Sequence, residues 1–381
     1  MDTDFYARLG IRPVINAAGH YTVLGGSVPT PRVRAAMDIA ASSMVDVLSL
    51  RSAVHAEVAR LTRNEAAYVT SGAAAGLYLA VAAAVSSHYK MSIERVAQAD
   101  IGRSRVLMPA NGRNPYDVAI RQVGVELIQV EGGQDALARA ITEDTVAVLH
   151  AVIGQADGMS TLRDSCAVAH DAGLPLIVDA AAQIPPASNL WEIPAAGADV
   201  VIFSGGKALG APQSTGLMLG SASFIDGVDA LAFPRHGYGR MFKVGRDQLV
   251  GALAALEDVL ARDEVMWLAS REAQVGRFLE AFRGNPLLEM TRGFPNIAGQ
   301  PVPYVLVRPR SLTFDGRLLT ERLRNGDPSI AVDRIPGHEG YAAGFIINTL
   351  ALREEEVDQV ISAIFAAIAD HSVEREQATS S

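Results

Sequence analysis

The stretch "DVVIFSGGKALGAPQSTG", residues 199–216, delivers one lysine directly after an apolar strand. A β-branched run ends at Phe203, and a Ser-Gly-Gly turn leads to Lys207 in a loop rich in Gly, Ala and Pro. A lysine is seldom buried, because its ammonium group must then be desolvated or paired. Its position here therefore indicates a chemical role for Lys207.

Around this stretch, short apolar runs alternate with helical segments. The runs that we expect to be strands are residues 66–70, 105–109, 125–130, 145–152, 175–180, 199–204 and 215–220. Such alternation predicts βαβ units, and hence an α/β fold with a mostly parallel seven-stranded sheet sandwiched by helices. Near residue 246 the alternation gives way to a long helical stretch (248–282) and then to a mixture of strands and helices.

This change of pattern predicts four parts of the chain. We expect an N-terminal arm (1–30), a large cofactor-binding domain (31–245) and a smaller C-terminal α+β domain (246–372) that opens with a bridging helix. The polar end "VEREQATSS" (373–381) has the composition of a disordered tail.

A carboxylate accompanies the lysine at the same predicted edge of the sheet. "PLIVDA" places Asp179 at the end of one strand, and the next strand along the chain leads to Lys207. Ligands of open α/β sheets bind outside the carboxyl ends of the strands. The pair suits pyridoxal phosphate, since the amine can condense with the cofactor aldehyde while the carboxylate keeps the pyridine nitrogen protonated. The alternative is a buried Lys–Asp ion pair.

A possible phosphate site follows the first strand. In "TSGAAAGL" (70–77) a strand runs into Ser71, Gly72 and Ala73, where a helix begins. The free N–H groups and the dipole of a helix N-terminus bind anions. Ser204 supplies a second hydroxyl within reach of the same place. Alternatively, the small residues only allow close packing of the helix on the strand.

Other segments give less specific signals. In "INAAGHYTVLGGSVP" (15–29), Asn16, His20 and Thr22 either line a site or belong to a tight structural loop. His150, near the end of its strand, is either a contact of the cofactor ring or a filler. "HGYGRMFKVGRD" (236–247) carries Arg240 and Lys243, which form either a solvated basic segment or a phosphate contact across a dimer interface.

Composition limits the class of protein. The net charge of −9 disfavours a nucleic-acid partner, which needs a basic surface. One cysteine, Cys166, excludes an intrachain disulfide and is best interpreted as a small buried apolar residue. The acidic N-terminus does not resemble a signal peptide, and "LYLAVAAAV" is too short to span a bilayer. From these features and the single cysteine we expect a cytoplasmic protein. The eight histidines show no HxH or HExxH spacing, so we expect no metal site.

Four segments together resemble fold-type I pyridoxal phosphate enzymes: "YVTSGAAAGL", "AHDAGLPLIVDAAAQIPP", "ADVVIFSGGKALGAPQSTGLMLG" and "GRMFKVGRDQLVGALAALE". The branch is that of bacterial selenocysteine synthase and D-glucosaminate-6-phosphate ammonia-lyase, and the resemblance extends from about Val14 to Ala363. It implies that Lys207 forms the Schiff base and that Asp179 pairs with the pyridinium. It also implies a phosphate site at Ser71, Gly72, Ala73 and Ser204, and a homodimer or larger oligomer in which Arg240 and Lys243 reach the neighbour's site.

Three departures from the branch bear on the substrate. His20 stands where many relatives have Thr or another small residue, and Asn111 stands where they often have a histidine beside the ring. "GDPSIAVDR" resembles a segment that ends in the arginine for the substrate carboxylate, but Asp333 precedes Arg334 here. Arg334 is therefore our first candidate for that role and Arg353 the second.

The resemblance implies a lyase acting on a small amino acid. Lys207 would remove the Cα proton, and loss of a β-hydroxyl would lead to a 2-keto acid and ammonia. Racemisation, aldol cleavage and transamination use the same groups, and a protein that binds the cofactor without turnover is a further alternative. A transfer-RNA substrate is disfavoured by the acidic charge and by the lack of a preceding module to hold it.

Overall fold

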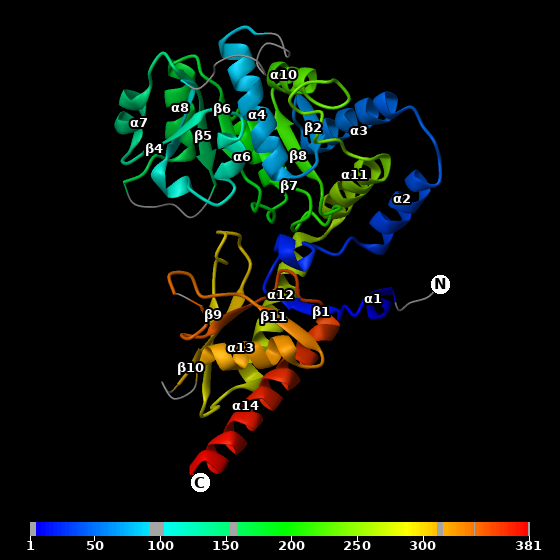
Figure 1. Cartoon of the computed structure of the whole chain (residues 1–381), viewed down its shortest axis with the longest axis vertical. Helices are drawn as coiled ribbons and strands as arrows, with labels where there is room; N and C mark the ends of the chain where they lie inside the picture. The colour runs from blue at the N-terminus through cyan, green and yellow to red at the C-terminus, as the bar shows by residue number, and fades with distance from the viewer. Residues whose placement is uncertain (1–4, 92–102, 153–157, 311–314, 339, 380–381) are drawn as a thin grey trace. The chain divides into compact units, whose positions relative to one another are not determined.

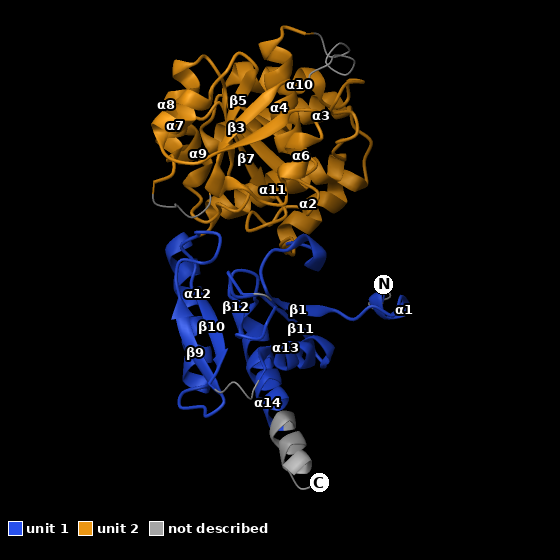
Figure 2. Cartoon of the chain, turned by 60° about the vertical axis from the view of Figure 1, so that its left-hand side comes forward, with its two compact units in different colours: residues 1–26, 263–381 blue, residues 27–262 orange. Residues whose placement is uncertain are grey.

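The computed structural model describes residues 5–91, 103–152, 158–310, 315–338 and 340–379. They form two compact units, coloured separately in Figure 2: unit 1 comprises residues 1–26 and 263–381, and unit 2 comprises residues 27–262. Residues 1–4 of the predicted arm and 380–381 of the predicted tail lie outside the described residues.

Unit 2 is built on a seven-stranded sheet, as the alternation of apolar runs predicts (Figure 1). The strands lie in the order β2-β8-β7-β6-β5-β3-β4, and of these seven β8 alone runs against its neighbours. The prediction of a mostly parallel sheet is therefore confirmed. The strand bounds are β2 Ala66–Thr70, β3 Arg105–Pro109, β4 Glu126–Val130, β5 Thr145–Ala151, β6 Leu176–Asp179, β7 Val200–Ser204 and β8 Gly216–Gly220.

Helices cover both faces of this sheet, which explains why its strands are apolar without alternation. Successive residues of a strand enter opposite cores: Val178 packs in one and Ile177 in the other. The core that contains Ile177 includes residues of α4 (Ala73–His88), α6 (Asp117–Arg121) and α10 (Ala222–Leu231). The opposite core includes residues of α3 (Val47–Thr62), α7 (Gln134–Ala140), α8 (Leu162–Asp171), α9 (Asn189–Ala195) and α11 (Arg246–Ala261).

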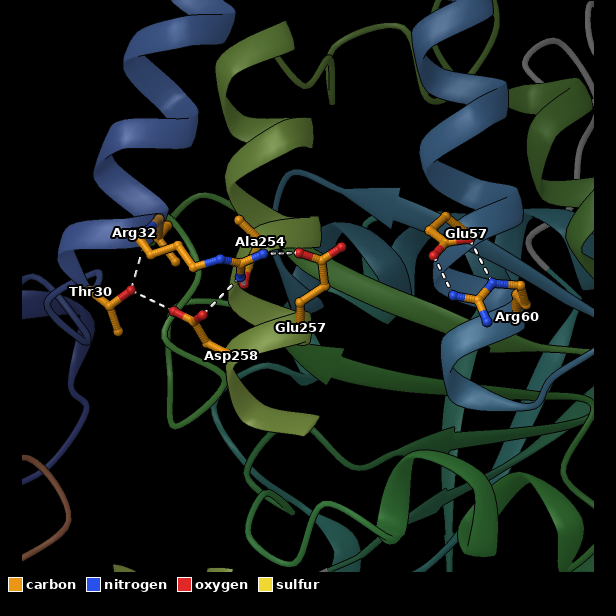
Figure 3. A network of polar contacts seen from close by, with 8 residues as sticks. Thr30, Arg32, Glu57, Arg60, Ala254, Glu257 and Asp258 are labelled. Carbon is orange, nitrogen blue, oxygen red and sulfur yellow. Dashed lines mark hydrogen bonds and ion pairs between the residues drawn. The ribbon is translucent and has the colours of Figure 1, made fainter. Parts of the chain in front are cut away.

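Helix α11 belongs to unit 2, although the sequence placed it at the start of the smaller domain. Arg32 of α2 (Pro31–Ala41) donates to the Ala254 carbonyl (2.9 Å) and to Asp258 (2.8 Å), and pairs with Glu257 (Figure 3). Thr30 caps α2 and also donates to Asp258 (2.6 Å). The helical stretch 248–282 is thus two helices, and the second, α12 (Glu264–Ala281), opens the C-terminal part of unit 1.

The expected boundary at residue 246 differs from the observed one at Asp263 for a physical reason. The apolar residues of α11, among them Leu249 and Leu256, enter the unit 2 core beside α3. Composition shows that a segment is helical and amphipathic, but it does not show which neighbour that apolar face will meet.

Unit 1 joins the N-terminal arm to the C-terminal elements. β1 (Val14–Ala17) pairs in parallel with β11 (Ser329–Val332), which places residues 1–26 in this unit and not in a separate arm. β9 (Leu288–Gly293), β10 (Tyr304–Pro309) and β12 (Phe345–Asn348) form an antiparallel sheet in the order β12-β10-β9. The remaining elements are α1 (Phe5–Arg8), η1 (Thr22–Leu24), α13 (Gly316–Asn325), η3 (Glu354–Glu356) and α14 (Val357–Thr379).

Helix α14 continues where the sequence predicts a disordered tail. Its backbone is helical to Thr379, so the expectation for residues 373–379 is corrected. The segment "VEREQAT" has no glycine or proline, and Glu, Arg, Gln and Ala favour helix, so polarity alone was a poor indicator of disorder. Among the described helices, none is both long and apolar enough to cross a bilayer.

Candidate cofactor site

The carboxyl edge of the unit 2 sheet collects the predicted chemical groups. β6 ends at Asp179, which is in register with Ile202 of β7 and with Ala151, the last residue of β5. β7 ends two residues further on, at Ser204, and Lys207 follows in the next turn. Because these strands are parallel, the Asp179 carboxylate and the Lys207 turn occupy the same edge.

Two glycines allow the turn that carries Lys207. The Gly205 N–H donates to the Thr215 carbonyl (2.8 Å), which brings residues 213–215 against the turn. A Cβ at Gly206 would lie 2.6 Å from Cα of Gln213, and one at Gly205 would lie 2.1 Å from Oγ1 of Thr215. Any side chain would therefore displace the backbone of the neighbouring segment. The close approach therefore requires glycine at both positions before Lys207.

Burial shifts both titratable groups of the pair toward their neutral forms. It lowers the pKa of the Lys207 ammonium, although the charge of Asp179 acts in the opposite direction. It also raises the pKa of Asp179, against the N–H of Ala181 (3.0 Å) and the charge of Lys207. A neutral amine is a nucleophile and a base, so a lowered pKa favours the form of Lys207 that covalent catalysis needs. Asp179 is a carboxylate for which a further cationic partner would favour the charged form.

The loop after β3 supplies residues that the sequence analysis missed. The side chain of Asn114 hydrogen-bonds Asp179, and the buried Asp117 lies close enough to raise its pKa. The ring centroid of Tyr116 lies 6.0 Å from Nζ of Lys207, within the range of a cation–π contact. The segment "NGRNPYD" follows the end of a predicted strand, and that position was the available signal. Asn111 lies in the preceding turn, η2 (Ala110–Gly112).

The predicted phosphate site lies at the same carboxyl edge, beside the ends of β2 and β7. Thr70 of β2 and Ser204 of β7 are both in register with Gly216 of β8, so three strands meet beside the Ser71–Ala73 turn. Gly72 has φ +126° and caps α4 without a side-chain hydrogen bond to the first turn. A Cβ at Gly216 would lie 2.9 Å from the Ala73 nitrogen. The glycines thus form a cradle at a helix N-terminus, the arrangement that favours a phosphate.

His150 points away from this edge group. Its strand partner is Val178, and its Nδ1 lies 2.9 Å from Oγ of Ser165 on α8. Asp179, one residue beyond Val178, faces the opposite side of the sheet, because side chains alternate along a strand. Burial lowers the pKa of His150 to about 4, so the imidazole is neutral. The geometry favours the second of the two interpretations, a filler, over a contact with the cofactor ring.

The donor set therefore fits pyridoxal phosphate: an amine with a lowered pKa, a carboxylate on the adjacent strand and an anion cradle. No family model matches the chain. It is 30% identical over 388 residues to D-glucosaminate-6-phosphate ammonia lyase of Salmonella typhimurium (strain 14028s / SGSC 2262), covering 98% of this chain and all of the relative. The chain belongs to the fold-type I pyridoxal phosphate enzymes related to that lyase.

Three further comparisons bear on the family and on the fold. A solved structure of D-glucosaminate-6-phosphate ammonia-lyase superposes with a TM-score of 0.82 at 29% identity, covering 98% of this chain and all of that one. A 5'-C-glycyluridine monooxygenase-decarboxylase of Streptomyces sp is 29% identical over 383 residues, 96% of this chain and 92% of the relative. The cysteine desulfurase CsdA of Escherichia coli (TM-score 0.58, 15% identity, 90% and 92% coverage) shares the fold.

Part of the basic segment 236–247 has a structural role. Arg246 donates to the carbonyls of Ala40 (2.8 Å) and Ala41 (2.9 Å), the last residues of α2. Arg240 lies over the ring of Phe233, 5.4 Å from its centroid, and Lys243 is exposed. Arg240 and Lys243 thus remain available for the predicted contact with a neighbouring subunit.

The predicted substrate residues from the two ends of the chain meet in unit 1. The β1–β11 pairing brings residues 16–24 beside Asp333 and Arg334. The Asn16 side chain is bound within its own turn: it donates to the Gly19 carbonyl (2.8 Å) and accepts from the N–H groups of Ala18 and Gly19 (both 3.1 Å). This favours the structural-loop interpretation of Asn16. His20 is half-buried, and Thr22 is exposed at the start of η1.

Of the two arginine candidates, Arg334 is the better placed. Its side chain lines a pocket with Tyr21, and its N–H donates to Asp333 (2.8 Å). Arg353 instead donates to Glu356 through Nε (2.9 Å) and a terminal nitrogen (2.6 Å), and lies 3.4 Å from Glu355. Because its guanidinium is already neutralised, Arg353 is a poor second candidate. Among the described side chains, no three His, Cys, Asp or Glu gather as metal ligands would.

Proposed function

We propose that the protein is a cytoplasmic pyridoxal phosphate-dependent lyase that deprotonates an amino acid at Cα and eliminates a β-hydroxyl group, giving a 2-keto acid and ammonia. The positions of Asp179 and Lys207 after adjacent parallel strands carry this proposal. Burial lowers the pKa of Lys207, which favours the neutral amine. The 30% identity to an ammonia lyase supports the choice of reaction.

The residues of the edge divide the cofactor between them. Lys207 would hold its aldehyde carbon, Asp179 its pyridine nitrogen, and the cradle of Ser71, Gly72, Ala73 and Ser204 its phosphate. When bound, pyridoxal phosphate supplies an aldehyde that bonds to amines and an aromatic ring that withdraws electrons from Cα. Asp179 would keep that ring electron-poor by accepting a hydrogen bond from its protonated nitrogen. Asn114, hydrogen-bonded to Asp179, orients the carboxylate.

Lys207 then acts as the base. With the cofactor bound, the freed Nζ would remove the Cα proton, and the β-hydroxyl would leave with a proton as water. The enamine that remains would tautomerise to an imine, and addition of one water to its C=N bond would release ammonia and the 2-keto acid, so the reaction is a net loss of ammonia. A lowered pKa increases the neutral fraction of Nζ, which is the form that can accept the proton. The ring of Tyr116 lies beside Nζ, with its centroid 6.0 Å away.

The substrate would meet residues of unit 1. Arg334 is proposed to bind its carboxylate through a forked pair of hydrogen bonds, and His20 and Thr22 stay proposed substrate contacts. We also propose a homodimer or larger oligomer in which Arg240 and Lys243 contribute to the neighbour's site. The net charge of −9 disfavours a transfer-RNA substrate.

An oxidative decarboxylation is the second candidate reaction, because a relative at 29% identity is a monooxygenase-decarboxylase. The relatives therefore carry different reactions, and racemisation, aldol cleavage and transamination remain alternatives to elimination, as does cofactor binding without turnover.

A substrate screen tests the lyase proposal. Purified protein saturated with pyridoxal phosphate is incubated with D and L hydroxyamino acids and with D-glucosaminate 6-phosphate, and 2-keto acid and ammonia are measured together. We expect equimolar release of both products, absent in Lys207→Ala. Inversion at Cα without release of keto acid would indicate a racemase, and release of an aldehyde would indicate an aldolase. If none of the substrates is converted, the protein binds the cofactor without turnover.

A further inference from the structure

A second carboxylate, that of Asp117, is buried near Asp179 at the carboxyl edge of the unit 2 sheet. Asp117 is the first residue of α6, and the proposed reaction does not use it. A carboxylate is seldom buried, because its charge must then be compensated. A buried carboxylate beside the proposed cofactor site is therefore a candidate for a role in that site.

The loop after β3 runs along this edge before α6 begins. A Cβ at Gly112 would lie 3.4 Å from Cβ of Ala151, the strand neighbour of Asp179. Four residues later in the chain, the ring centroid of Tyr116 lies 6.0 Å from Nζ of Lys207. The loop thus lies against the end of β5 and the Lys207 turn, and it brings the start of α6 to the same place.

Asp117 and Asn114, which precedes it in the loop, act on Asp179 in opposite senses. Burial raises the pKa of Asp179 most, the charge of Asp117 raises it further, and a hydrogen bond with the Asn114 side chain lowers it. The Asn114 carbonyl accepts a hydrogen bond from the Asp117 N–H (3.1 Å), so one turn holds both residues. A negative charge that disfavours the ionised Asp179 carboxylate also favours a cation placed beside the two carboxylates.

The ion-pair partner of Asp117 compensates this charge only in part. Arg113 pairs with Asp117 through Nε, at the helical spacing i, i+4. The Asp117 side chain is 3% exposed and that of Arg113 is 33% exposed, so solvent screens the guanidinium more than the carboxylate. The negative charge of Asp117 therefore still acts on Asp179.

We propose that Asp117 supplies a second negative charge for the cofactor ring and, together with Asp179, favours a protonated ring nitrogen. This inference rests on the proposed function, in which Asp179 contacts that nitrogen. Two carboxylates that are buried close together repel each other, and a positive charge beside them relieves the repulsion. The repulsion between Asp117 and Asp179 thus becomes a preference for a cationic ring over a neutral one.

The test compares two probes that differ only at the ring nitrogen: pyridoxal phosphate and its deaza analogue, in which C–H replaces that nitrogen. Cofactor-free protein is titrated with each probe, and absorbance gives the two dissociation constants. We expect the wild-type protein to prefer pyridoxal phosphate and Asp117→Asn to reduce this preference roughly 10-fold, which corresponds to one pKa unit. If Asp117→Asn weakened the binding of both probes by the same factor, Asp117 would only support the loop, and the inference would be overturned.

Arg113→Lys is the matched control, because it alters the same ion pair but keeps both charges, and it should leave the preference unchanged. Asp179→Ala tests Asp117 without replacing it: the preference should fall but persist, since the Asp117 carboxylate remains. A preference abolished in Asp179→Ala, or reduced as much in Arg113→Lys as in Asp117→Asn, would contradict the inference. Failure of the wild-type protein to bind either probe would instead contradict the proposed cofactor site, and the inference with it.

Discussion

The carboxyl and amino edges of the unit 2 sheet both carry a buried or half-buried aspartate beside a basic side chain, but the two aspartates have different roles. At the carboxyl edge, Asp179 lies beside Lys207. Burial raises the pKa of Asp179 and lowers that of Lys207, so both shifts favour the neutral forms. At the amino edge, Asp199 precedes β7 and uses one oxygen to accept from the Leu176 N–H (2.8 Å) and to meet Nε2 of His170 (3.0 Å). Asp199 therefore fixes the start of two strands.

The amino edge also shows why a cluster of reactive residue types is weak evidence for a site. Sγ of Cys166 lies 3.7 Å from His170, so Cys, His and Asp follow one another as in a nucleophilic triad. Yet the thiol donates to the Gly197 carbonyl (3.3 Å), and burial raises the pKa of Cys166, which disfavours the thiolate. The carboxyl edge differs from the amino edge because it buries an amine and a carboxylate whose hydrogen bonding is incomplete.

Exchanging one oxygen for nitrogen at each edge should give the largest contrast. Asp179→Asn removes the charge that holds the ring nitrogen protonated, and we expect turnover to fall roughly 100-fold, equivalent to about 3 kcal/mol for a charged hydrogen bond. Asp199→Asn keeps an oxygen for Leu176, so it should retain activity and lose about 1 kcal/mol of stability. Steady-state rates and urea unfolding of both variants measure this. Similar activity in the two would remove the distinction between the edges.

The turn at the carboxyl edge should tolerate no side chain. In Gly206→Ala the Cβ would lie 2.6 Å from Cα of Gln213, and we expect a loss of about 1–3 kcal/mol in the free energy of unfolding, together with weaker cofactor retention. Gly276→Ala, in α12 with nothing within 4 Å of its Cβ, is the control and should gain up to about 1 kcal/mol. Wild-type stability and cofactor content in Gly206→Ala would show that the close approach is not required.

Much of this edge could be predicted from the sequence, because strand ends are marked by local pattern. The runs before Asp179 and Lys207 are bounded by glycines and prolines, and parallel strands bring their carboxyl ends together. The face to which His150 points was not predictable, since a strand that is apolar on both faces carries no alternation to set its phase. The contacts of Asn114 and Tyr116 depend on the path of a loop.

The organisation of the chain into units was less accessible, because it depends on contacts between distant residues. β1 pairs with β11 across more than 300 positions of sequence, and nothing local in "VINA" marks that partner. In the same way, α11 is joined to α2 by Arg32, far earlier in the chain. The gathering of Tyr21, Asp333 and Arg334 at one pocket follows from the β1–β11 pairing and was equally hidden.

A smaller effect concerns His150, on the opposite face of the sheet. Its pKa is about 4 in the folded protein and about 6.5 in the unfolded chain. Below pH 6.5 the unfolded state therefore binds more protons, and stability should fall by about 2 kcal/mol between pH 7 and pH 4.5. His150→Asn should reduce this loss, as seen by urea unfolding at both pH values, and should keep activity. A large loss of turnover would instead place His150 at the cofactor ring.

Chemical trapping shows whether Lys207 forms the covalent bond to pyridoxal phosphate. Protein saturated with the cofactor is reduced with borohydride and digested, and the peptides are mapped by mass spectrometry. We expect a pyridoxyl label on Lys207, in the peptide that contains "VIFSGGKALGAP", and none in Lys207→Ala. A label on another lysine, or no label in cofactor-saturated protein, would contradict it.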